Sequence, residues 1–185
     1  MAGTKLISNQ ERDMIKLSNF NRDVIVGMLL SDGSIQLNRK SRSINGCLRF
    51  IQSLDRSQYV WFLFNILSHY CSSYPFLARR AGAGVKSYGV EFFTRSLPCI
   101  TELYTLFYVT NVKIIPQNIY ELLTPVALAH LIMGDGVARP YGLQLCTDSY
   151  TLPDIVRMMN VLTIRYGLSC TLHKKRTEQS RVYIS

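Results

Sequence analysis

The sequence has little of what marks metal-binding, membrane or secreted proteins. Its three histidines are scattered, and its five cysteines include no pair at Cys-x-x-Cys spacing, so we expect reduced cysteines and no zinc site. No apolar run reaches the roughly 20 residues that span a bilayer. The first 20 residues lack the apolar stretch of a secretion signal. We therefore expect an intracellular protein without a membrane partner.

Acidic residues are also scarce. The 185 residues include 12 Asp and Glu against 21 Lys and Arg, a net charge of +9. An excess of this size favours a polyanionic partner, either nucleic acid or an anionic membrane surface. A soluble protein that is merely basic is the alternative at this point.

Two apolar segments end in the same Asp-Gly pair. Residues 24–33 read VIVGMLLSDG and residues 127–136 read ALAHLIMGDG, and both have the apolar spacing of a helix. Small residues four apart on one stripe let two helix backbones approach closely. The stripe positions of the two helices are Gly27, Ser31, His130 and Gly134. We therefore expect the two helices to form an interface.

Such an interface would bring Asp32 and Asp135 together. A carboxylate at a helix C-terminus is disfavoured by the helix dipole, and two neighbouring carboxylates repel each other. A divalent cation offsets both effects, and Mg²⁺ prefers oxygen ligands. An ordinary helix-ending turn explains a single Asp-Gly pair, but it explains two in matched repeats less well.

The similarity continues after the motif helices. Residues 47–67 resemble residues 142–162, and each segment alternates like a strand before it becomes a helix. A further match aligns SRVYIS (180–185) on GVEFFT (89–94), which places the last residue opposite Thr94.

These matches predict an α+β fold of two pseudo-symmetric αββαββα repeats. The first repeat is predicted over residues 18–118 and the second over residues 119–185. Nothing in the second repeat corresponds to the helix LPCITELYTLF of the first. The second repeat is therefore expected to be truncated, and another chain that completes it is one expected partner.

The two motifs resemble the LAGLIDADG motif of homing endonucleases and the related intron maturases. They read IVGMLLSDG (25–33) and LAHLIMGDG (128–136). Other stretches similar to family members include QSLDRSQYVWFLF, FFTRSLPCITELY and LCTDSYTLPDIVRMMNVL. The chain is most similar to the single-chain, two-repeat proteins of fungal mitochondrial introns. The resemblance implies a mitochondrial protein whose two repeats form a DNA-binding saddle.

The resemblance also implies an activity, site-specific hydrolysis of double-stranded DNA with Mg²⁺ or another divalent cation. Asp32 and Asp135 match the residues that bind metal in the family. Lys113 in NVKIIP matches a lysine near the metal, and Asp55 in SLDRS matches a polar residue that orders water. These four residues are the expected catalytic set.

The second repeat departs from the family pattern in two places. Tyr150 stands where Asp55 stands in the first repeat, so this half is expected to use Asp148 or Ser149. His130 replaces the small third residue of the motif, and it is expected to widen the helix contact or to stack within it.

In the family, each repeat places a curved antiparallel sheet along the DNA major groove. The matching strands are expected at 34–40, 47–53, 76–80, 86–94, 137–147 and 168–184. Side chains suited to bases and phosphates in these strands are Gln36, Asn38, Arg39, Lys40, Arg42, Arg49, Gln52, Arg79, Arg80, Lys86, Arg139, Gln144, His173, Lys174, Lys175, Arg176 and Arg181. A solvated surface charge is the alternative for any one of them.

Two other functions stay open from the sequence. Some family members assist the splicing of their own intron RNA, so the chain can be a maturase. It can also be a non-catalytic nucleic-acid-binding component of a ribonucleoprotein assembly, with ribosomal RNA as the partner.

Overall fold

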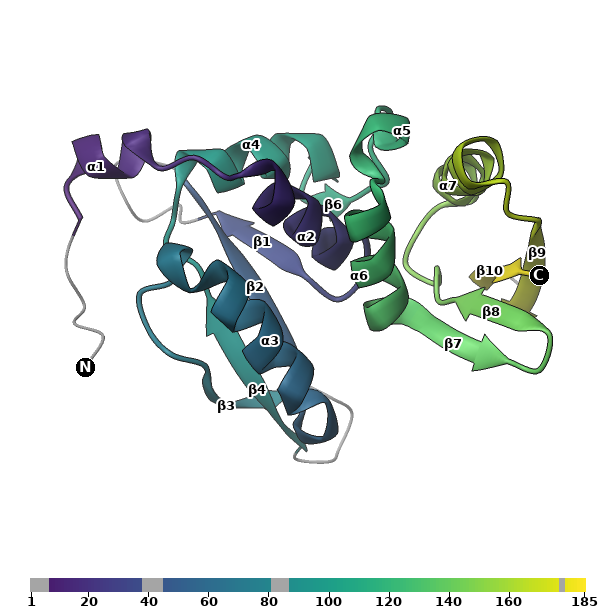
Figure 1. Cartoon of the computed structure of the whole chain (residues 1–185), viewed down its shortest axis with the longest axis horizontal. Helices are drawn as coiled ribbons and strands as arrows, with labels where there is room; N and C mark the ends of the chain where they lie inside the picture. The colour runs from purple at the N-terminus through teal and green to yellow at the C-terminus, as the bar shows by residue number, and fades with distance from the viewer. Residues whose placement is uncertain (1–6, 38–44, 81–86, 177–178) are drawn as a thin grey trace. The chain divides into compact units, whose positions relative to one another are not determined.

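The structure, a computed structural model, describes residues 7–37, 45–80, 87–176 and 179–185 (Figure 1). The chain divides into two compact units: unit one is Met1–Arg22 with Asp32–Tyr104, and unit two is Asp23–Ser31 with Thr105–Ser185. Helix α2 (Asn19–Leu30) therefore contributes most of its length to unit two. None of the described helices is long and apolar enough to cross a membrane.

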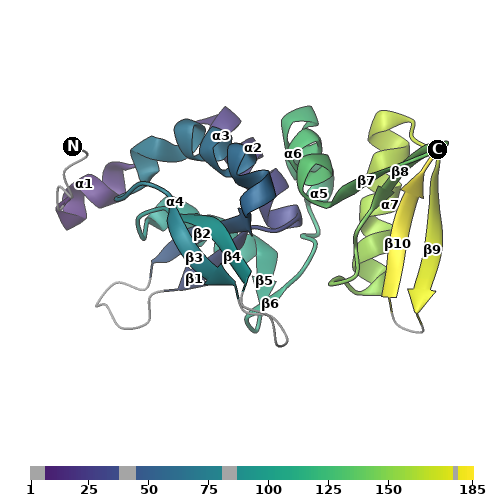
Figure 2. The ribbon, with the colours of Figure 1, turned by 90° about the horizontal axis from the view of Figure 1, so that it is seen from below.

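Unit one is built on an antiparallel four-stranded sheet in the order β1-β2-β4-β3. Its strands are β1 (Ser34–Leu37), β2 (Gly46–Ser53), β3 (Phe76–Arg80) and β4 (Ser87–Phe93). Its helices are α1 (Asn9–Met14), η1 (Leu54–Arg56), α3 (Ser57–Leu67), η2 (Ser68–Tyr70) and α4 (Pro98–Phe107), which runs into unit two. Helix α3 lies against β2 and β4 on one face of the sheet (Figure 2).

Strict alternation along β2 separates the two faces of this sheet. Leu48 and Phe50 point to the α3 side and are buried, whereas Arg49 and Ile51 are half-buried on the other side. The ring of Phe50 meets Tyr59 of α3 edge-on at 5.8 Å between centroids. Because side chains on a strand alternate with a period of two, one face forms the core and the other remains open to a ligand.

Unit two repeats this design. Its sheet has the order β7-β8-β10-β9, and α7 lies against β9 and β10. The elements are β5 (Tyr108–Val109), β6 (Val112–Lys113), α5 (Ile119–Leu122), α6 (Pro125–Asp135), β7 (Gly136–Arg139), β8 (Gly142–Leu145), α7 (Leu152–Tyr166), β9 (Cys170–Arg176) and β10 (Gln179–Ile184). Thr124 caps α6 by accepting the Ala127 N–H at 3.2 Å, with Pro125 in the first turn.

The predicted α+β class and the predicted order of elements are confirmed. Helix α2 is followed by β1, β2, α3, β3, β4 and α4, and α6 is followed by β7, β8, α7, β9 and β10. Strand β10 is the last element that the structure describes, and its last residue is Ile184.

The predicted alignment of the last strand is wrong by one residue. Arg49 of β2 pairs with Phe93, and Gln144, which aligns with Arg49, pairs with Tyr183. Tyr183 therefore corresponds to Phe93 rather than to Phe92. The physical reason is burial: Phe92 and Val182 are both 0% exposed, and a slip of one residue would turn such a side chain to the open face.

Candidate active site

Helices α2 and α6 pack against each other within unit two, and Gly27 is the point of contact. A Cβ placed on Gly27 would lie 2.4 Å from the carbonyl oxygen of Ala127 and 2.5 Å from Cβ of His130. Neither distance is possible between non-bonded atoms, so the approach requires glycine at this position. The two motif helices therefore touch.

The other stripe residues line the same region. Ser31 turns its hydroxyl back to the carbonyl oxygens of Gly27 and Met28, at 3.2 Å each. Gly134 and His130 are buried on α6. Burial lowers the pKa of His130, which favours a neutral imidazole at pH 7.

Two side chains hold the C-terminal end of α2. The Tyr150 hydroxyl lies 3.1 Å from the carbonyl oxygen of Leu30 and 3.4 Å from that of Leu29. The Lys113 ammonium group donates to the carbonyl oxygen of Ser31 at 2.8 Å. Carbonyl oxygens at the C-terminal end of a helix lack partners within the helix, and a cation there interacts favourably with the negative end of the helix dipole. The chain is thus held immediately before Asp32.

Asp32 belongs to unit one, where Gln52 contacts it. The Gln52 amide donates to Oδ2 of Asp32 at 2.5 Å, and Gln52 is only 5% exposed. The alternation along β2 thus places Gln52 on the inner side against a carboxylate, whereas the sequence suggested an exposed DNA contact. Burial raises the pKa of Tyr59, and the negative charge of Asp32 raises it further. Asp55 lies exposed in η1.

Asp135 is the last residue of α6, and its negative charge acts on the Tyr150 hydroxyl. Burial raises the pKa of Tyr150, and the charge of Asp135 is the next cause. The sequence pointed to Asp148 or Ser149 in place of this tyrosine. The Asp148 carboxylate accepts two hydrogen bonds from Arg181, at 2.8 and 3.1 Å. No sequence signal marked Tyr150 as a residue that bonds to α2, because its partners are 120 residues away.

The open face of the first sheet carries the candidate DNA contacts Gln36 and Arg49. Gln36 is exposed, and Arg49 forms an ion pair with Glu91. The Arg49 guanidinium also lies over the Phe93 ring, 5.8 Å from its centroid. Arg79 is exposed on β3, but its register places it on the face opposite to that of Arg49.

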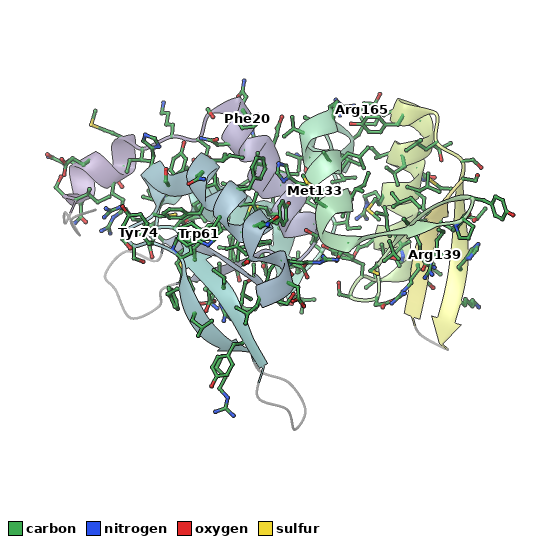
Figure 3. All side chains as sticks on the ribbon, turned by 60° about the horizontal axis from the view of Figure 1, so that its bottom comes forward. Phe20, Trp61, Tyr74, Met133, Arg139 and Arg165 are labelled. Carbon is green, nitrogen blue, oxygen red and sulfur yellow. The ribbon has the colours of Figure 1, made fainter. Side chains whose placement is uncertain are left out.

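The open face of the second sheet gathers four of the predicted contacts. Arg139 of β7, labelled in Figure 3, donates to the Gln144 side-chain oxygen at 2.6 Å. Arg181 pairs directly with His173 across β10 and β9, and His173 stacks on Tyr183 at 5.0 Å between ring centroids. This face thus carries four polar side chains that bond to or stack on neighbours, with Arg181 held by Asp148, and it also includes the exposed Val137 opposite Gln144.

The remaining predicted contacts are placed only in part. Lys174 is exposed on β9. The backbones of three others lie in β3 and β9: Arg80, Lys175 and Arg176. Five lie outside the described residues: Asn38, Arg39, Lys40, Arg42 and Lys86.

Asp32 and Asp135 each offer carboxylate oxygens, which divalent cations accept as ligands. Among the residues that the structure describes, no group of three or more His, Cys, Asp or Glu is placed to hold a metal ion. A zinc site needs such a group, whereas Mg²⁺ is commonly bound by one or two carboxylates together with water and substrate phosphates.

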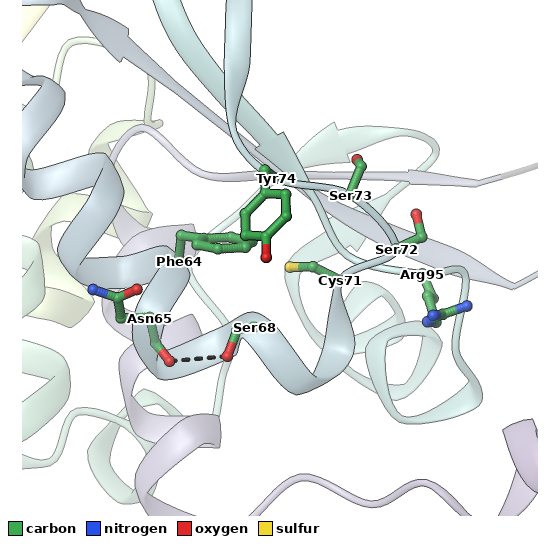
Figure 4. Close-up of a pocket in the computed structure, with 8 residues that line it drawn as sticks. All are labelled: Phe64, Asn65, Ser68, Cys71, Ser72, Ser73, Tyr74 and Arg95. Atoms are coloured by element: carbon green, nitrogen blue, oxygen red, sulfur yellow. Dashed lines mark hydrogen bonds between the residues drawn. The ribbon is translucent and has the colours of Figure 1, made fainter. Parts of the chain in front are cut away.

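A separate pocket lies beside the end of α3 in unit one. Its volume is about 450 Å³, and Phe64, Cys71, Tyr74 and Arg95 line it together with three serines and an asparagine (Figure 4). Burial raises the pKa of Cys71 to about 12, so its thiol is a poor nucleophile. The described residues that line the pocket include no Asp or Glu.

Comparisons with known proteins match the chain to one family. A family model described as the LAGLIDADG DNA endonuclease family matches residues 22–185. The cytochrome b mRNA maturase bI2 of Debaryomyces hansenii is 28% identical over 167 residues, which cover 84% of this chain and 63% of that protein. The DNA endonuclease I-ChuI of Chlamydomonas applanata is 25% identical over 184 residues, which cover 91% of this chain and 83% of that protein. The chain thus spans less than two thirds of the yeast maturase.

Solved structures share the fold. The homing endonuclease I-WcaI bound to its DNA recognition sequence matches with a TM-score of 0.82 at 22% identity, over 97% of this chain and 84% of that one. I-DmoI in complex with DNA and Mn matches with a TM-score of 0.51 at 13% identity, over 90% of this chain and 89% of that one. At these identities the likeness concerns the fold alone.

Proposed function

This chain belongs to the LAGLIDADG DNA endonuclease family, and from that premise we propose that it is a site-specific, divalent-cation-dependent endonuclease of double-stranded DNA. The observation that carries the proposal is the pair of motif helices in contact at Gly27, each followed or ended by an aspartate. Each unit's sheet has one face that its helix leaves uncovered, and we assign that face to a DNA groove. The I-WcaI and I-DmoI complexes, which hold DNA, support the same use of the fold.

In the proposed reaction, Asp32 and Asp135 would hold Mg²⁺ or another divalent cation. When bound, the cation would supply activation of water and stabilisation of charge on the scissile phosphate. Gln52 orients the Asp32 carboxylate through its hydrogen bond. Lys113 adds positive charge at the end of α2 and offsets charge that develops during hydrolysis. Asp55 is exposed in η1 and is available to order water.

Substrate binding is assigned to the two open sheet faces. Arginine and glutamine recognise guanine and adenine through paired hydrogen bonds in the major groove. Arg139, Gln144, His173 and Arg181 form such a surface on the second sheet. Neutralised phosphates release counterions, so much of the affinity comes from the basic residues of these faces and loops.

The test first selects the duplexes that the protein binds from a random 30-base-pair library. Cleavage of the recovered duplexes is then measured. We expect cutting with Mg²⁺ and none with EDTA. Asp32→Asn and Asp135→Asn should each lower cleavage by about 10²-fold or more, while affinity stays near that of the unaltered protein. Asp13→Asn, on the exposed side of α1, is the matched control and should cut normally. Cleavage by both active-site variants at normal rates would overturn the proposal.

A second candidate function is intron RNA binding, as a maturase. It is favoured by the similarity to the yeast cytochrome b mRNA maturase. For either function we propose an origin in an organelle intron. Retention of a labelled intron RNA, but not of a duplex library, would favour the maturase function over the nuclease.

A further inference from the structure

The two open sheet faces have the same architecture but differ in the chemistry of their centres. In the first sheet Arg49 pairs with Phe93, and in the second sheet Gln144 pairs with Tyr183. Phe93 therefore corresponds to Tyr183, and Arg49 corresponds to Gln144. By the same registers, Phe76 aligns with His173. Phe76 pairs with Glu91, two positions before Phe93, and His173 pairs with Arg181, two positions before Tyr183. Phe76 stacks on Phe93 at 6.1 Å between centroids and 15° between planes, as His173 stacks on Tyr183.

In the first sheet, the stacked pair of Phe76 and Phe93 exposes apolar surface to solvent. Phe76 is 44% exposed, and Phe93 and Ile51 are half-buried on the same face. The charges between them cancel, because Arg49 is paired with Glu91 and lies over the Phe93 ring. The centre of this face is therefore apolar and neutral, although the protein as a whole has a charge of +9.

An apolar surface placed on DNA needs an apolar partner. Base edges in the major groove are hydrogen-bond donors and acceptors, and covering them with hydrocarbon leaves polar groups without partners. The one apolar group that the groove offers is the C5-methyl of thymine. The equivalent face of the second sheet instead carries Arg139, Gln144, His173 and Arg181, which suit hydrogen bonding.

We propose that the cluster of Phe76, Phe93 and Ile51 recognises thymine C5-methyl groups, so that the centre of the first face reads its half of the DNA target by apolar contact, whereas the centre of the second face reads the other half by hydrogen bonds. The inference rests on the proposed binding of DNA by the sheet faces. It adds the chemical basis on which the two halves of the target differ. Phe76 and Phe93 are the specificity-determining residues of the first half.

The experiment compares two random 30-base-pair libraries, one made with thymidine and one with deoxyuridine. Deoxyuridine keeps every hydrogen-bonding group of thymidine and lacks only the methyl. We expect the thymidine library to yield targets with thymines enriched in one half, and the deoxyuridine library to lose that enrichment. Replacing each enriched thymine by deoxyuridine in a selected duplex should weaken binding about fourfold. The same replacement in the other half should have no effect.

Two matched variants connect the effect to the sheet. Phe76→Ser should remove the difference between thymidine and deoxyuridine duplexes. His173→Ser, at the equivalent position of the second sheet, should preserve it while changing preferences in the other half. Far-UV circular dichroism checks that both variants are folded, and Phe93→Ser replaces Phe76→Ser if the latter is not.

Equal enrichment from the two libraries with the unaltered protein would overturn the inference, even if the DNA is bound and cut. Retention of the methyl effect in Phe76→Ser and Phe93→Ser would also overturn it. A protein that binds neither library would refute the proposed function and this inference with it. In that case the apolar face would be available to a protein partner instead.

Discussion

Replacing Gly27 by alanine has two opposing effects on the stability of the fold. Alanine in an unhindered helix stabilises the fold by about 1 kcal/mol relative to glycine. At Gly27 the added Cβ would lie 2.4 Å from the Ala127 carbonyl oxygen and 2.5 Å from His130 Cβ. The oxygen is a backbone atom and the carbon is attached to the backbone, so no rotamer change relieves the clash. The two helices must move apart.

Overpacking of this kind costs about 1–3 kcal/mol, and clashes with backbone atoms belong at the upper end. After the gain in helix propensity, we expect a net loss of about 1–2 kcal/mol. In a protein of this size each kcal/mol lowers Tm by about 2–4 °C. Gly27→Ala should therefore melt about 2–8 °C below the unaltered protein, and Gly27→Val lower still.

Differential scanning calorimetry at matched protein concentration measures the change. Gly167→Asn is the control, because Gly167 has a φ of 65° that Asn tolerates and nothing lies within 4 Å of its Cβ position. Its Tm should change little. A Tm of Gly27→Ala equal to or above that of the unaltered protein would show that α2 and α6 do not approach as described.

Three further predictions follow from the residues around the motif helices. Tyr150→Phe removes the hydroxyl that bonds to the carbonyl oxygens of Leu29 and Leu30. Urea denaturation should show a free energy of unfolding lower by about 1–2 kcal/mol. The control Tyr141→Phe, at an 88% exposed position, should not change it. The pKa of His130 is lowered by burial, so the unfolded chain binds the proton more readily and stability should fall as the pH drops below about 6.5. His130→Gln should flatten this dependence of Tm on pH, and an unchanged slope would assign it to other groups. DNA affinity should fall steeply with salt concentration, since several Lys and Arg displace counterions, and a flat dependence in filter binding would argue against phosphate contacts.

The sequence by itself determined the repeat, the two motif helices and the alternating faces of the strands. Periodicity is a local property, because a helix must place its apolar residues every three to four positions and a strand every two. The repeated Asp-Gly ending, together with Gly27 and Ser31 on one stripe, was sufficient to predict a close contact between two helices 100 residues apart. The chemistry of Asp32 and Asp135 could likewise be anticipated, as a hypothesis, from residue type and spacing.

Only the tertiary structure decided which side chains meet. Gln52 contacts Asp32 because its strand register turns it to the inner side, although its residue type suggested an outer contact. The sequence reading passed over Tyr150 and expected Asp148 or Ser149 to order water in this half, whereas the structure shows that the Tyr150 hydroxyl bonds to the end of α2. The register of β10 was also decided by packing, because Val182 must be buried and alternation alone permits a slip of one residue. Contacts between distant segments depend on the whole core, and no local pattern encodes them.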